Sequence, residues 1–202
     1  MKLIGSNTSP YVRKARLVLL EKNIPHTYVV DPPSDPNSEV YRVNPLGRIP
    51  ALILDDKTCV FDSPVIAEYA DTLNDTPILI PRQDALAKMR VKRWEALADG
   101  IMDSAIVVRN EQLRPQEKQD PNTLDLHNGA ITRTLSYIAD QLGNREWCEG
   151  NDITLADLAL VSALCYLDLR QSERDWRGAH PSLAAWFKRI SARQSVKITL
   201  TE

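Results

Sequence analysis

The sequence N-P-L-G-R-I-P-A-L at residues 44–52 decides the fold. The two prolines and the glycine of this run indicate a turn, and the apolar residues after it indicate a strand beginning near Ala51. Since an X-Pro bond prefers the trans form by only about 0.5–1 kcal/mol, a fold can hold the Ile49-Pro50 bond cis at small cost. A cis bend would leave the N–H and C=O of Ile49 outside the strand ladder, where an extended peptide can pair with them. A loop that simply contains proline is the alternative interpretation.

Size and composition indicate an ordinary globular protein. The chain has 202 residues, enough for one large domain or two modest ones. Apolar residues make up 43%, charged residues 26%, and the net charge of −2 argues against a nucleic-acid partner. No apolar run approaches the length of a membrane span, and residues 1–6 lack the long apolar segment of a secretory signal. We therefore expect a cytoplasmic protein that binds neither nucleic acid nor membranes.

The cysteines and histidines show no pattern of a metal or redox site. The three cysteines, at positions 59, 148 and 165, are widely spaced and form no C-x-x-C pair. This argues against a disulfide framework, a zinc site and a dithiol redox motif, and it fits a reducing compartment. Because the three histidines have no ligand spacing either, we predict that the protein holds no metal.

The first 76 residues predict a small α/β domain. Short β-branched or apolar runs predict strands at residues 2–6, 27–30, 51–54 and 58–61. Two helices are expected where a hydroxyl residue directly precedes a proline, with Pro10 and Pro64 in their first turns. The predicted order is β-α-β, a loop helix, then β-β-α.

Residues 77–83 are predicted to be a linker, and residues 84–202 an all-helical domain. Apolar residues recur every three or four positions in two long segments, residues 84–108 and 124–142. This spacing places the apolar side chains on one face of a helix in each segment.

A buried helix is predicted after residue 154. Thr154 and Asp157 have the form of a capping box, so we assign Asp157 a folding role. The segment 158–169 is apolar nearly all round, which is typical of a helix at the centre of a bundle. A last amphipathic helix is expected from residue 180 onward.

Four motifs in this order resemble the cytosolic glutathione transferase family. They are T-S-P-Y-V-R-K at 8–14, N-P-L-G-R-I-P-A-L at 44–52, D-S-P-V-I-A-E-Y at 62–69 and N-D-I-T-L-A-D-L at 151–158. The chain is most similar to bacterial members with a serine at the start of the first helix. The resemblance implies a thioredoxin-like N-terminal domain, an all-α C-terminal domain, a cis Ile49-Pro50 bond, glutathione as co-substrate and a homodimer.

By this resemblance, Ser9 stabilises the thiolate of bound glutathione. A thiol with a pKa near 8.5 is only about 3% ionised at neutral pH, and lowering its pKa by roughly two units makes it about 75% ionised. One hydrogen bond to a charged acceptor contributes about 1.5–3 kcal/mol, so one hydroxyl at a helix N-terminus suffices. Thr8 is the second candidate, and a plain helix cap is the alternative role of Ser9. Since no histidine lies in the motif, Ser9 is not expected to act as a nucleophile.

The resemblance also implies the residues that hold the rest of glutathione. Asp62 would pair with the γ-glutamyl ammonium, while Ser63 and the helix N–H groups take the neighbouring carboxylate. Ile49, beside Pro50, would bind the cysteinyl main chain, and Arg48 would reach the glycyl carboxylate. Helix capping by Asp62 and Ser63, and a solvent-exposed Arg48, are the alternatives.

Three functions follow from these residues. The first is a transferase in detoxification that adds the glutathione thiolate to a small hydrophobic electrophile or uses it to reduce a peroxide. The second is a glutathione-dependent dithiol enzyme, which the absence of cysteine at position 9 disfavours. The third is a non-catalytic regulatory or stress protein that keeps the fold and the glutathione site.

Overall fold

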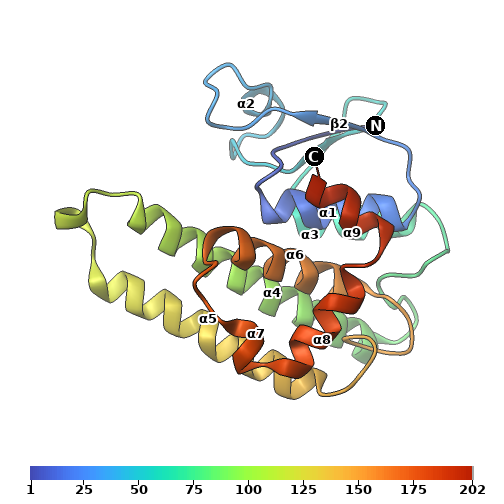
Figure 1. Ribbon diagram of the computed structural model, residues 1–202. Coiled ribbons are helices and arrows are strands. Elements are labelled where there is room, and N and C mark those ends of the chain that lie inside the picture. The colour runs from blue at the N-terminus through green and yellow to red at the C-terminus, as the bar shows by residue number, and fades with distance from the viewer. Residues whose placement is uncertain (202) are drawn as a thin grey trace. The chain divides into compact units, whose positions relative to one another are not determined.

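The computed structural model describes residues 1–201 and the side chains of residues 1–200 (Figure 1). The chain divides into two compact units, one of residues 1–84 with the C-terminal segment from Arg193, the other of residues 85–192. The C-terminal segment therefore groups with the α/β unit, whereas the sequence analysis had placed it with the helical part.

The first unit contains a four-stranded mixed sheet. Its strands are β1 (Lys2–Gly5), β2 (Thr27–Val30), β3 (Ala51–Ile53) and β4 (Cys59–Val60). Their order is β2-β1-β3-β4, with β1 parallel to β2 and β3 antiparallel to both of its neighbours. All four predicted strands are confirmed, and β4 is shorter than predicted.

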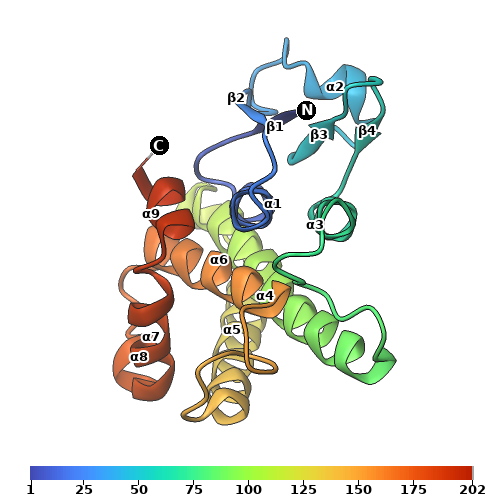
Figure 2. The same ribbon diagram turned by 90° about the vertical axis from the view of Figure 1, so that its right-hand side faces the viewer.

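Helices cover both faces of this sheet. The helices of the first unit are α1 (Pro10–Glu21), α2 (Val40–Val43), α3 (Ser63–Thr72) and α9 (Gln194–Thr201), of which α9 lies against α1. Helices α1 and α3 lie side by side below the sheet in Figure 2. On the opposite face Val40 of α2 packs in one core cluster with Ile4, Ala51 and Ile53. This is the predicted thioredoxin-like arrangement.

The second unit is all helical, as predicted. It contains α4 (Ala85–Gln112), a 3₁₀ turn (Gln116–Lys118), α5 (Pro121–Leu142), α6 (Leu155–Arg170), α7 (Trp176–Ala179) and α8 (Pro181–Ile190). Helix α6 packs against α4 and α8 and is buried along nearly its whole length, which explains its all-round apolar sequence. Among residues 1–201, no helix is long and apolar enough to cross a membrane.

The start of α6 carries the predicted capping box. Asp157 is completely buried, and its carboxylate accepts hydrogen bonds from the main-chain N–H of Thr154 (2.9 Å) and of Cys148 (2.8 Å). The Thr154 hydroxyl also donates to it, at 3.0 Å. Burial raises the pKa of Asp157, and these hydrogen bonds oppose the shift. The folding role predicted for Asp157 is confirmed.

Candidate functional site

Three chain segments meet at one end of the four-stranded sheet. Ile4 lies opposite Ala51 in the antiparallel β1–β3 pair, so the turn that leaves β1 lies beside the loop that enters β3. Leu52 lies opposite Val60 in the antiparallel β3–β4 pair, so the chain leaving β4 reaches the same end. The register therefore brings together the start of α1, the loop before β3 and the start of α3. These are the three places where the sequence analysis located its site residues.

Ser9 lies at the start of α1 and serves as its N-cap. Its backbone is extended (φ −77°, ψ 123°), and its hydroxyl oxygen accepts a long, 3.4 Å hydrogen bond from the N–H of Val12. A hydroxyl that accepts one hydrogen bond still has its proton to donate. Ser9 is half-buried, whereas Thr8 is exposed. Gly5 lets this turn approach β1, because a Cβ at Gly5 would collide with the Val12 side chain.

The loop before β3 is held by Asn44, a residue that the sequence analysis did not single out. Its side chain is buried, donates to the carbonyl oxygen of Arg48 at 2.7 Å and accepts from the N–H of Leu46 at 3.0 Å. Gly47 has a positive φ of 59°, which glycine adopts without a steric cost. The Asn-Pro-x-Gly pattern is a turn signal that could have identified Asn44.

Ile49 and Pro50 follow directly at the entrance of β3. The Ile49-Pro50 peptide bond is cis, as expected. Ile49 lies outside β3, and among residues 1–201 its main-chain N–H and C=O have no hydrogen-bond partner. Unpaired main-chain groups beside a strand can bind an extended peptide as an added strand. Arg48 has an exposed side chain, which both of its predicted roles require.

Asp62 and Ser63 form the start of α3. Asp62 occupies the N-cap position of α3, but its carboxylate makes no capping hydrogen bond. The alternative role of Asp62 as a capping side chain is therefore not seen in the structure. The Asp62 side chain is exposed and Ser63 is buried, with 2% of its surface accessible. The first-turn N–H groups of a helix and its dipole favour an anion at this end. A negative side chain and an anion-attracting helix end therefore lie next to each other.

Lys22 ties α1 to α3. It is only 1% exposed, and its ammonium donates to the Asp71 carboxylate at 3.1 Å and to the carbonyl oxygens of Asn74 (2.8 Å) and Pro77 (2.6 Å). A cation is favourable at the C-terminal end of α3, where carbonyl groups lack helical partners. The sequence analysis assigned no role to Lys22. Its partners lie far along the chain, so no local pattern marks them.

The arrangement suits an extended, zwitterionic small peptide. Two helix N-termini can each attract an anionic group, and the exposed Asp62 carboxylate can attract an ammonium. The free main-chain groups of Ile49 can pair with the peptide's own backbone. Within the described residues, no group of three or more histidine, cysteine or acidic side chains is arranged to hold a metal ion.

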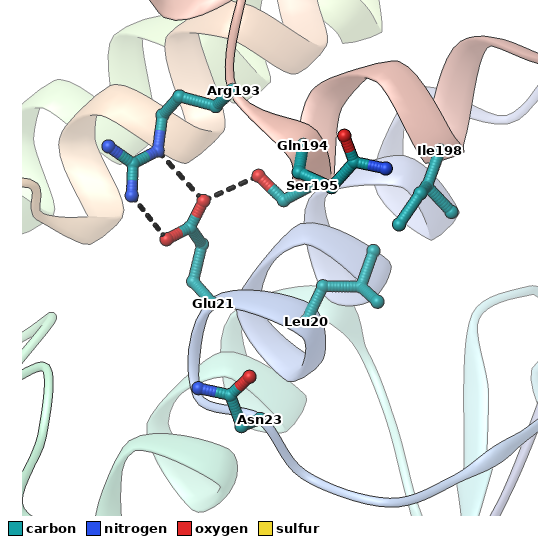
Figure 3. A pocket seen from close by; sticks show the side chains of 7 residues that line it. All are labelled: Leu20, Glu21, Asn23, Arg193, Gln194, Ser195 and Ile198. Atoms are coloured by element: carbon teal, nitrogen blue, oxygen red, sulfur yellow. Dashed lines mark hydrogen bonds and ion pairs between the residues drawn. The ribbon is translucent and has the colours of Figure 1, made fainter.

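The hollow of about 490 Å³ in the first unit lies elsewhere (Figure 3). Glu21, in its wall, is the last residue of α1, whereas Ser9 precedes the first. At 1.5 Å per residue, the two ends of α1 are roughly 18 Å apart. The hollow is therefore separate from the site at the end of the sheet.

Two family models match the chain. The model of the glutathione S-transferase N-terminal domain matches residues 8–73, and the model of the C-terminal domain matches residues 99–194. Together with the fold, these matches define a protein with a thioredoxin-like N-terminal domain and a helical C-terminal domain. The chain belongs to the glutathione S-transferase family.

Similar proteins span nearly the whole chain. The uncharacterized GST-like protein YibF of Escherichia coli is 37% identical over 195 residues, covering 96% of either chain. A glutathione S-transferase from Methylobacillus flagellatus, solved with glutathione bound, is 42% identical with a TM-score of 0.95 and covers 98% of each chain. One from Methylobacterium radiotolerans, in complex with glutathione sulfonate, is 34% identical with a TM-score of 0.94, covering 98% of this chain and 93% of that one.

Proposed function

We propose that this chain binds glutathione at the described end of the sheet and stabilises its thiolate for transfer to a small hydrophobic electrophile or for peroxide reduction. The observation that carries the proposal is the convergence of two helix N-termini on the unpaired main chain of Ile49. The glutathione and glutathione sulfonate bound by two similar structures support the choice of ligand.

Each part of glutathione has a matching group in the site. Asp62 pairs with the γ-glutamyl ammonium, and Ser63 with the α3 N–H groups takes the neighbouring carboxylate. The cysteinyl main chain pairs with Ile49, next to Pro50, and Arg48 reaches the glycyl carboxylate. That Asp62 makes no capping bond of its own supports this use of its carboxylate.

Ser9 then acts on the sulfur. Its hydroxyl donates a hydrogen bond to the thiolate, and the α1 N-terminus adds a favourable field, while the thiol proton passes to solvent. In conjugation, the sulfur forms a bond to carbon, and a leaving group such as halide departs with its bonding electrons. In peroxide reduction, two glutathione thiols are oxidised to a disulfide while the peroxide becomes an alcohol and water. Thr8 remains the second candidate for the donor.

A glutathione-binding regulatory or stress protein is the second candidate function. One observation favours it: the Ser9 hydroxyl already caps α1 through Val12, a role that it would keep without any turnover. Both candidates predict glutathione binding, and only the first predicts product formation.

Calorimetry with glutathione, followed by turnover assays with an aryl halide and a hydroperoxide, tests the proposal. We expect saturable, one-to-one binding and formation of a conjugate or of glutathione disulfide. Binding without turnover on either substrate class would favour the regulatory protein. Absence of binding at millimolar glutathione would remove both functions.

Oligomeric state and location are also proposed from the family. We expect a homodimer in the cytoplasm. Size-exclusion chromatography with light scattering should give about twice the chain mass, and a monomeric mass across the working concentration range would contradict the expectation.

A further inference from the structure

Helix α9 lies antiparallel along α1, and α1 interacts with both of its ends. Glu21, the last residue of α1, accepts two hydrogen bonds from Arg193 (2.9 and 2.7 Å) and one from the Ser195 hydroxyl (2.5 Å) at the start of α9 (Figure 3). At the other end, the Arg13 guanidinium of α1 donates to the carbonyl oxygen of Thr199 at 3.3 Å. A carboxylate at the N-terminus of α9 and a cation near its C-terminus both complement the dipole of α9.

Helix α9 depends on this docking for its structure. It has eight residues, fewer than an isolated helix needs to be stable in water. Val196 is fully buried and Ser195 is 8% exposed, so one side of α9 is packed. The helix is therefore folded while it lies on α1 and is expected to unfold when it detaches.

Arg13 links this docking to the candidate site. Arg13 is 8% exposed. Its guanidinium donates to the carbonyl oxygen of Thr199, and within the described residues its Nε has no hydrogen-bond partner. A buried cation that loses its acceptor must move toward water, because an unpaired charge is costly to bury. The Arg13 N–H donates to the carbonyl oxygen of Ser9 at 3.0 Å, within the first turn of α1. This is the ordinary main-chain bond of the first turn, so the Arg13 side chain affects Ser9 only where its bond to Thr199 holds the main chain of that turn in place.

We propose that Arg13 is a positioning residue for Ser9, and that the docked helix α9 holds α1 in the position in which the Ser9 hydroxyl meets the glutathione sulfur. The inference rests on the proposed glutathione function. Electrostatic stabilisation of a thiolate depends on a donor held in place beforehand, so a small displacement weakens it.

Two single variants remove the docking from opposite sides. Arg13→Met keeps the aliphatic volume of Arg13 and removes its donors. Val196→Asp places a charge on the buried side of α9 and detaches it. The matched control is Arg133→Met, the same change at an exposed arginine of α5. Circular dichroism identifies any variant that has lost its overall fold.

The readout is the pKa of the bound glutathione thiol, followed by the ultraviolet absorbance of the thiolate against pH. We expect Arg13→Met and Val196→Asp to raise this pKa by about half a unit, a roughly threefold change in the acid dissociation constant. Arg133→Met should leave it at the wild-type value. Hydrogen exchange of the first-turn amides of α1, measured without glutathione, should become faster in the first two variants alone.

A charge swap provides a rescue. Glu21→Arg should raise the thiol pKa as Val196→Asp does, and the double variant Glu21→Arg, Arg193→Glu should restore it by rebuilding the pair in reverse. If wild-type protein forms the thiolate at neutral pH and every variant titrates as wild type does, the positioning role is overturned while the proposed function stands. If the wild-type protein itself gives no thiolate, the proposed function fails and this inference fails with it.

Discussion

The starts of α3 and α6 carry similar residues and differ in what those residues do. Each has an acidic side chain near a hydroxyl, Asp62 with Ser63 and Asp157 with Thr154. Asp157 is completely buried and accepts hydrogen bonds from two main-chain N–H groups and one hydroxyl. Asp62 is exposed and makes no capping bond. One carboxylate is fully used by the fold, and the other remains available to a ligand.

Burial explains the difference. Desolvating a carboxylate is costly unless its oxygens are hydrogen-bonded, so a buried acid at a helix start must bond to its own chain. An exposed acid is hydrated and has no such requirement. The same two kinds of side chain, placed in a different order, therefore stabilise the helical unit at α6 and leave an open anionic group at α3.

The largest effect is expected from Asp157→Ala. It should lower the free energy of unfolding by about 3 kcal/mol, because three buried donors lose their acceptor. Urea denaturation measures the change. The folded fraction should bind glutathione with wild-type affinity, and a stability loss within the measurement error would refute the folding role.

Asp62→Ala should show the opposite pattern. We expect glutathione affinity to fall about 10- to 100-fold, the equivalent of a lost charge-assisted hydrogen bond of about 1.5–3 kcal/mol. Stability should change by less than about 0.5 kcal/mol, as is usual for an exposed side chain. Calorimetry on Asp62→Ala and on Asp140→Ala, an exposed acid of α5, measures the first effect. Unchanged affinity in Asp62→Ala would take away its assignment.

Glu21 is a third acidic side chain near a helix start, because it accepts a hydrogen bond from Ser195 in the first turn of α9. We expect a substitution of Glu21 to have the smallest effect of the three. Burial would raise its pKa, but hydrogen bonds from Arg193 and Ser195 more than compensate and hold the pKa below its ordinary value of 4.5. A carboxylate with a lowered pKa stabilises the fold fully above 4.5, and this contribution is lost as the pH falls through the lower, folded-state value.

The melting temperature measured against pH tests this sign. Glu21→Gln should melt below wild type at neutral pH, and the gap should narrow as the pH drops below 4.5. If the difference in melting temperature stays constant over the acidic range, the ion pair between Glu21 and Arg193 makes no pH-dependent contribution to stability.

Local signals explain what could be predicted from the sequence. The prolines and hydroxyls at the starts of α1 and α3, and the capping box of α6, act within three or four residues, so their patterns are visible in a single chain. The strands were placed correctly because their apolar runs are bounded by turns. The candidate site residues could be proposed from the sequence because each lies at one of these boundaries.

The remaining features depend on residues far apart in the sequence. The bond from Arg193 to Glu21 spans 172 positions, and the bonds from Lys22 to the end of α3 span 49 to 55 positions. No local pattern indicates such partners, so α9 and its docking were not predicted. Burial is likewise a tertiary property, which is why capping stayed an open alternative for Asp62.

The pH titration of glutathione bound to the wild-type protein and to Ser9→Ala tests the central claim most directly. We expect the bound thiol in wild type to ionise about two pKa units below free glutathione, and Ser9→Ala to lose one to two of these units, roughly the value of one hydrogen bond to a charged group. Ser9→Thr, which keeps both the cap and the donor, should remain close to wild type. A wild-type thiol that titrates as free glutathione does, or an identical pKa in Ser9→Ala, would contradict the account.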